Sequence, residues 1–94
     1  MAVIECRSEL DIATVGALRQ QLLDALQIPE PLEIDGRAVR KIHTAALQAF
    51  LSAVIEARSR NLPVRWRDPS PTLVESARLL GLAGDLGFGA TGNS

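Results

Sequence analysis

The chain has 94 residues, of which 47% are hydrophobic and only 3% aromatic, and its formal net charge is −1. This length predicts one domain, with a core built from aliphatic side chains. The near-neutral charge argues against binding to nucleic acid or to an anionic membrane, and the scarcity of aromatic residues leaves no stacking platform for bases.

The only cysteine, Cys6, cannot form an internal disulfide, and we expect it to pack as a small hydrophobic residue in the first strand. The N-terminus lacks a charged region followed by a long apolar run, and no apolar run approaches the roughly 20 residues that cross a bilayer. We therefore expect a cytoplasmic protein without membrane insertion. One histidine and one cysteine are too few for a structural zinc site, so no metal or cofactor is expected.

The first third of the chain predicts a strand at 2–6, a short second strand at 8–12 and a helix at 13–27. The strand at 2–6 has the composition and rough alternation of a β-strand. We expect Thr14 to cap the helix, and a proline pair after residue 28 to end it. Its apolar residues recur at helical spacing, namely Val15, Leu18, Leu22 and Leu26.

The middle of the chain predicts a strand at 32–35, a loop at 36–41 and the strongest helix of the sequence, at 44–60. We expect Thr44 to begin this helix as its N-cap. One side of the helix is apolar and predicts a buried face, formed by Leu47, Phe50, Leu51, Val54 and Ile55.

The last third predicts a strand within 61–67 and a helix at 72–82, which Gly81 ends. Ser70 or Thr72 would cap that helix, and Thr72 and Glu75 have the spacing of a capping box. A glycine-rich tail follows, of which 89–94 would be flexible.

The alternation of strands and helices predicts an α/β fold with a short, mostly parallel sheet and three to four helices. No linker, repeat or low-complexity block indicates a second domain, so we expect a single domain at 1–88.

No segment carries a recognisable catalytic motif. His43 is the only possible histidine of a catalytic triad, and no nucleophile elbow, P-loop or dinucleotide-binding glycine pattern follows a strand. We therefore do not expect an enzyme.

The best candidate site is the start of the helix at 44–60. A hydroxyl at a helix N-terminus lies near unpaired backbone N–H groups, which also stabilise a phosphate, so Thr44 is a sensible phosphoacceptor. The alternative is that Thr44 only caps the helix. His43, beside it, is either structural or pairs with a carboxylate or phosphate of a partner. A basic loop with Arg37, Arg40 and Lys41 lies just upstream.

Two acidic residues, Asp11 and Asp35, lie at or near predicted strand ends. In a parallel sheet these ends and the helix N-termini share one side, where open α/β sheets place their binding surfaces.

Three segments together resemble the STAS family along nearly the whole chain: "LDIATV", "IHTAAL" and "LLGLAGDLGF". The family comprises anti-sigma factor antagonists and related domains of sulfate transporters. The resemblance implies a non-catalytic α/β module that binds protein partners. In the bacterial antagonists, a partner kinase that is also the anti-sigma factor phosphorylates a Ser or Thr that begins the second helix.

The resemblance places Thr44 at the phosphoacceptor position and Asp11 at an acidic position near the partner surface. It implies partner contacts by Asp11, His43, Thr44, Ala45, Ala46 and Gln48. Where the family usually has Asp and Gly, this chain has His43 and Ala46. The first change removes a charge beside the acceptor, and the second adds bulk in the first turn.

Three functions follow as alternatives. The first is an anti-anti-sigma-like regulator with Thr44 as a phosphorylation switch. The second is a STAS subunit of a phospholipid-transport complex or of a chemosensory cluster, which binds its partner, for example a transporter ATPase subunit, without phosphorylation. The third is a small-ligand-binding domain that uses the cleft at the strand ends. The sequence does not indicate the oligomeric state.

Overall fold

The computed structural model describes residues 1–88, and the predicted flexible tail at 89–94 lies outside the described residues. The elements in chain order are β1 (Ala2–Glu5), β2 (Glu9–Leu10), α1 (Ile12–Leu26), β3 (Leu32–Asp35), β4 (Lys41–Ile42), α2 (Thr44–Ser59), β5 (Val64–Arg67), α3 (Pro71–Leu79) and α4 (Ala83–Leu86).

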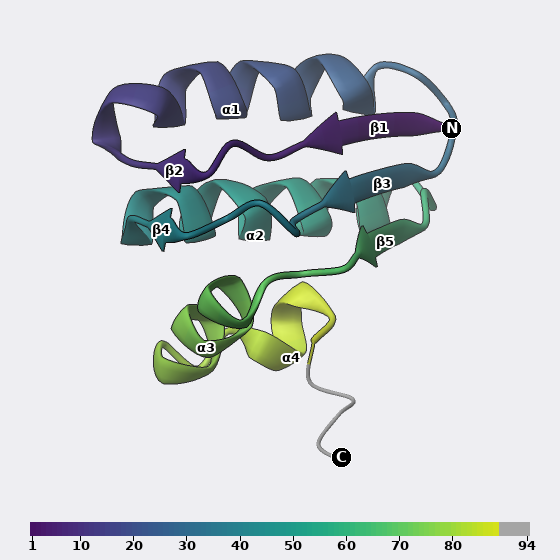
Figure 1. Ribbon diagram of the computed structural model, residues 1–94. Helices are drawn as coiled ribbons and strands as arrows, with labels where there is room; N and C mark the ends of the chain where they lie inside the picture. Colours follow the sequence, from purple (N-terminus) through teal and green to yellow (C-terminus); the bar gives the residue numbers. More distant parts are fainter. Residues whose placement is uncertain (89–94) are drawn as a thin grey trace.

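The strands form two small parallel sheets. In the first, β3 lies between β1 and β5, and in the second β2 pairs with β4. Figure 1 shows β2 and β4 continuing the directions of β1 and β3. The predicted α/β class and parallel pairing are confirmed. The strand β4 was expected to be part of a loop, because a pair of residues is too short to show a strand periodicity.

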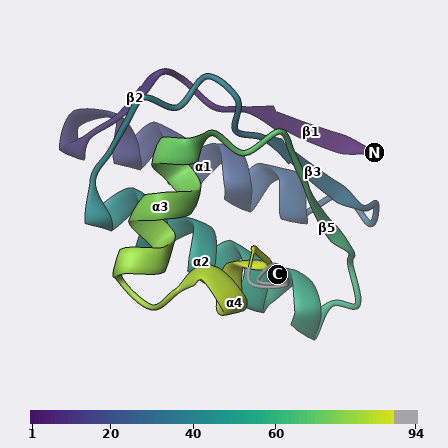
Figure 2. The same ribbon diagram turned by 60° about the horizontal axis from the view of Figure 1, so that its bottom comes forward.

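Both ribbon views place α1 and α2 on one face of the strands, and no helix of residues 1–88 covers the other (Figure 1 and Figure 2). The register aligns Ile4 with Ile34 and Ile34 with Trp66 on the helix-covered face. The next positions, Glu33 and Arg65, point to the uncovered face because side chains alternate along a strand.

The core lies between the strands and the two long helices. In α1 the buried residues are Leu18, Leu22, Ala25 and Leu26. In α2 they are Ala46, Leu47, Ala49, Phe50, Ala53, Val54 and Ala57. The buried face of α2 therefore differs from the predicted one: it is rotated toward the alanines, and Ile55 is 56% exposed.

The C-terminal part of the described chain packs on Trp66. The Trp66 Nε1–H donates a hydrogen bond to the Leu86 carbonyl at 2.8 Å, and the Trp66 ring lies 4.7 Å from that of Phe88. These contacts hold α4, a helix that was predicted to be part of a glycine-rich tail. The short helix was not predicted because glycines disfavour helices and because Trp66, on which it packs, is distant in the sequence.

The helix α3 begins after Ser70, whose hydroxyl accepts a hydrogen bond from the Leu73 N–H at 3.1 Å. Of the two caps considered, Ser70 is correct, and the predicted capping box of Thr72 with Glu75 is wrong. Glu75 instead forms an ion pair with Arg78. Gly81 follows the helix with a φ of 74°, as its predicted role at the helix end requires.

None of the helices in residues 1–88 is long and apolar enough to span a membrane.

Cys6 is 8% exposed. Its burial raises the pKa of its thiol to about 12, and the negative charge of Asp35 makes a smaller contribution in the same direction. The thiolate is the reactive form, so we predict that Cys6 does not react with a thiol reagent in the folded protein at mildly alkaline pH. Absorbance with Ellman's reagent measures this, with the urea-unfolded chain as the reactive control. Equal rates for the folded and unfolded chains would contradict the prediction.

Candidate functional site

The N-termini of the two long helices lie side by side. Leu10 of β2 pairs with Ile42 of β4, and the His43 N–H donates to the Leu10 carbonyl at 2.7 Å. Asp11 and His43 follow these strand residues directly, and α1 and α2 begin immediately after them. The parallel pair β2–β4 therefore brings Asp11 and His43 together at the same end of the molecule, where Figure 1 shows both helices beginning.

Asp11, not Thr14, is the N-cap of α1. The Asp11 carboxylate accepts a hydrogen bond from the Thr14 N–H at 3.0 Å, and the Thr14 hydroxyl accepts one from the Asp11 N–H at 3.0 Å. This is a capping box with Thr14 at its third helical position. Thr14 takes part in the capping box as predicted, but it is not the cap itself; Asp and Thr are both common caps, so the sequence does not separate them.

His43, not Thr44, is the N-cap of α2. The His43 Nδ1 accepts a hydrogen bond from the Ala45 N–H at 3.0 Å, and its backbone carbonyl accepts from the Ala46 N–H at 2.9 Å. The predicted capping role of Thr44 is therefore wrong. Histidine is not among the preferred caps, which is why the neighbouring threonine was chosen from the sequence.

Thr44 is the first residue of α2 and is exposed. Its hydroxyl makes no side-chain hydrogen bond with any other residue of the described part of the chain. Because the capping role belongs to His43, the Thr44 hydroxyl is not needed to complete the start of α2.

The remaining predicted contact residues differ in exposure. Gln48 is exposed and Ala45 is partly exposed, whereas Ala46 has 0% exposure. The Ala46 side chain faces the core, so it neither adds bulk at the surface nor offers a contact there. The expectation that Ala46 contacts a partner does not fit this geometry.

One residue was missed. Ile12 directly follows Asp11 and is 69% exposed, more than most large hydrophobic side chains of the described chain. The signal was an isoleucine outside the helical spacing of Leu18, Leu22 and Leu26. Ile12 therefore places one apolar side chain beside the exposed polar ones at the start of α1, although a single exposed hydrophobic residue is common on protein surfaces.

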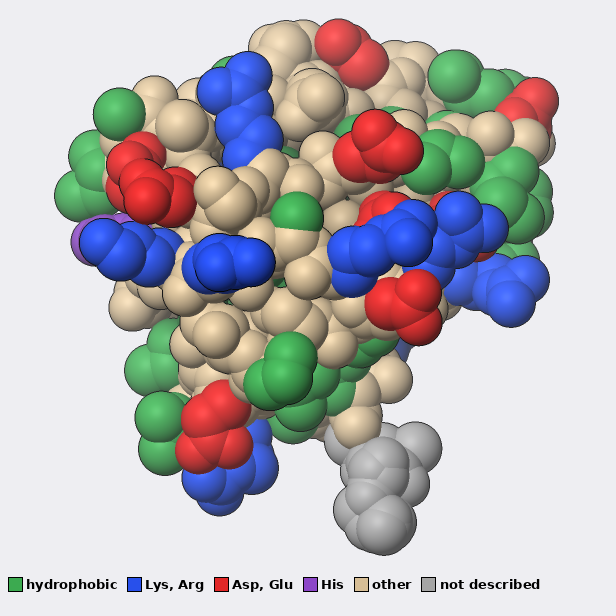
Figure 3. Space-filling view, viewed as in Figure 1, with side chains coloured by type: hydrophobic (Ala, Val, Ile, Leu, Met, Phe, Trp, Pro, Cys, Tyr) green, Lys and Arg blue, Asp and Glu red, His purple; other side chains and the backbone are tan. Residues whose placement is uncertain are grey.

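Asp35 does not join the helix N-termini. Its carboxylate accepts hydrogen bonds from the Arg37 guanidinium, at 2.8 Å from Nη2 and 3.2 Å from Nε, and it lies on the uncovered strand face. On the same face Arg67 forms an ion pair with Glu33 at 3.2 Å. Figure 3 shows basic side chains in a band across the middle of this face, with acidic side chains above and below it.

The hydrogen bonds from Arg37 lower the pKa of Asp35 from its ordinary value. A carboxyl group whose pKa is lower in the folded than in the unfolded chain stabilises the fold above its unfolded pKa, and this is lost as the pH falls through the folded pKa. We predict that the Asp35→Asn variant loses less of its free energy of unfolding than the parent chain does when the pH falls below about 4. Urea unfolding at several pH values measures it, and an unchanged difference between neutral and acidic pH would contradict it.

The cap formed by His43 gives a further prediction. His43→Ala removes the acceptor for the Ala45 N–H and is expected to lower the free energy of unfolding by about 1 kcal/mol. His43→Asp restores an acceptor and adds a negative charge at the helix N-terminus, so it is expected to recover at least the stability of the parent chain. Urea unfolding followed by circular dichroism measures both; equal stability of the alanine variant would show that the cap contributes nothing.

Within residues 1–88, no three His, Cys, Asp or Glu side chains lie together in a way that could hold a metal ion. The helix N-termini instead bring together two caps, one exposed hydroxyl and one exposed apolar side chain.

The chain is thus a small α/β protein with short parallel sheets, in which the N-termini of two helices meet at one edge. A family model described as "Mlab, STAS domain" matches residues 1–88. The chain therefore belongs to the STAS family, as the resemblance implied. No curated protein matches the chain.

Proposed function

We propose that this chain is a non-catalytic, cytoplasmic module of bacterial signalling that binds a protein partner reversibly. We define its docking surface as Asp11, Ile12, His43, Thr44 and Gln48, all of which are exposed at or near the starts of α1 and α2. The observation that supports the proposal most strongly is the Thr44 hydroxyl, which is exposed and makes no side-chain hydrogen bond within the described residues. Ile12 supplies the apolar contact that the adjacent polar residues lack.

The proposed partner is an anti-sigma-type protein with serine/threonine kinase activity. It would transfer the γ-phosphoryl group of ATP to the Thr44 Oγ1, release ADP and take the hydroxyl proton on a base of its own. The phosphate would add about −1.5 to −2 charge at neutral pH, next to the positive end of the α2 dipole. The phosphate is tolerated by the helix but changes the charge of the docking surface, so modification would end docking.

The test is phosphorylation by the purified partner kinase, with the site located by mass spectrometry. We expect phosphate on Thr44 and none on the Thr44→Ala variant. Thr14 and Ser70 serve as internal controls, because their side-chain oxygens are already engaged in helix caps. Phosphate on another residue, or none with the correct kinase, would refute the switch.

A second candidate is a constitutive subunit of a transport assembly, bound through the same docking surface to an ATPase subunit. One observation favours it: His43 already completes the start of α2, so the helix needs no phosphate there. In that case the chain purified from its own cells would carry unmodified Thr44 and co-purify with an ATPase subunit. A kinase of the anti-sigma type in the eluate would favour the first candidate instead.

A further inference from the structure

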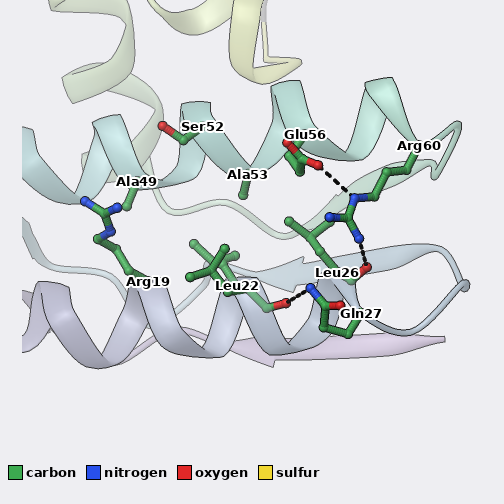
Figure 4. Close-up of a pocket in the computed structure, with 10 residues that line it drawn as sticks. Arg19, Leu22, Leu26, Gln27, Ala49, Ser52, Ala53, Glu56 and Arg60 are labelled. Carbon is green, nitrogen blue, oxygen red and sulfur yellow. Dashed lines mark hydrogen bonds and ion pairs between the residues drawn. The ribbon is translucent and has the colours of Figure 1, made fainter.

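A groove of about 320 Å³ lies between α1 and α2, outside the docking surface. Its floor is apolar and is formed by Leu22 and Leu26 of α1 and by Ala49 and Ala53 of α2. Figure 4 shows how the groove arises: large side chains on α1 stand opposite small ones on α2. Such a pairing leaves space that neither helix fills.

An arginine reaches across the groove at each end. Arg60 of α2 donates from Nη1 to the Leu26 carbonyl of α1 at 2.9 Å and pairs through Nε with Glu56 at 2.8 Å. At the opposite end, Figure 4 shows the Arg19 side chain extending from α1 toward Ala49.

The two arginines differ in their charge balance. Glu56 compensates Arg60, whereas Arg19 forms no ion pair within residues 1–88. The groove therefore combines an apolar floor, a closed end and one uncompensated cation at the other end. An anion with a single apolar chain is complementary to this arrangement.

We propose that the groove binds a medium-chain carboxylate, with the hydrocarbon chain over Leu22 and Ala53 and the carboxylate on the Arg19 guanidinium. A guanidinium can hold a carboxylate through two parallel hydrogen bonds. From Arg19 to Gln27 the groove extends about 12 Å along α1, at 1.5 Å per residue. Its volume lies at the lower end of the range of small-molecule sites.

A partner helix fits the groove less well than a single chain. A helix with its side chains is about 10–12 Å wide, and Arg60 bridges α1 and α2 in the path it would take. The groove and the docking surface share no residue, so this inference does not depend on the proposed function.

The test uses the full chain and decanoate below its micellar concentration, with calorimetry for affinity and amide NMR for location. We expect saturable binding, with shifts concentrated on residues 19–27 and 49–60. Arg19→Gln is expected to weaken decanoate binding at least tenfold and to leave the weaker binding of uncharged decanol unchanged. Arg65→Gln is the matched control, because Arg65 is an exposed cation on the strand face.

A second variant tests the apolar part. Ser52 lies on the exposed rim of the groove, so Ser52→Phe covers the floor without entering the core and is expected to abolish binding of both probes. The inference is overturned if decanoate does not bind the folded parent chain, if its shifts lie elsewhere, or if Arg19→Gln and Arg65→Gln weaken it equally. Loss of protein-partner capture in Arg19→Gln, without decanoate binding by the parent chain, would assign the groove to a protein instead.

Discussion

Thr44→Arg is expected to abolish capture of the protein partner, whereas Thr44→Ser is expected to retain it. Thr44 is exposed at the first position of α2, within the docking surface, and its hydroxyl is not used within the described part of the chain. Arginine there places a long cation where a partner must approach closely and desolvate the surface. Loss of a central contact costs about 2 kcal/mol or more, which is about thirtyfold in Kd.

The measurement is affinity capture from the native cell, followed by calorimetry with the partner that is identified. Ser59→Arg is the matched control, because Ser59 is exposed at the opposite end of the same helix and the substitution changes the charge equally. Thr44→Asp is expected to lose the partner like Thr44→Arg. If Thr44→Arg and Ser59→Arg capture the same partner equally well, the docking surface lies elsewhere.

Phe50→Ala is expected to cost about 3–5 kcal/mol of the free energy of unfolding, enough to leave much of the chain unfolded. Phe50 has 0% exposure, and its ring lies 5.2 Å from that of Trp66 in an edge-to-face arrangement. Removing it leaves a cavity between α2 and β5 and takes away the support for Trp66, on which α4 packs. A domain of this size has little stability in reserve.

Urea unfolding followed by circular dichroism measures this cost. Phe50→Leu keeps most of the volume and is expected to cost about 1.5 kcal/mol or less. Ile55→Ala is the exposed control on the same helix and is expected to change the stability by about 0.5 kcal/mol or less, because Ile55 is 56% exposed. A cost for Phe50→Ala similar to that for Ile55→Ala would show that Phe50 does not hold the core together.

The positions of the candidate site residues were predicted in outline, but their contacts were not. Thr44 and His43 were both singled out from the sequence, and both lie exposed at the start of α2. Thr44 was predicted to cap the helix, but His43 caps it. The cap is the residue whose side-chain atom reaches the Ala45 N–H, and this depends on the backbone geometry at His43. Ala46 was expected at the surface because the resemblance places it where the family usually has Gly, near a partner, but the turn of the helix directs its side chain into the core.

The sequence by itself determined the class of fold and the family, because these depend on the order of strands and helices and on patterns local to each segment. The periodic spacing of Leu18, Leu22 and Leu26 is sufficient to predict a buried helix face. Only the tertiary structure decided which residues meet. The pairing of Leu10 with Ile42 brings Asp11 and His43 together, and the approach of α1 to α2 leaves the groove bordered by Arg19. Such contacts join residues about 30 positions apart, and no local pattern in the chain encodes them.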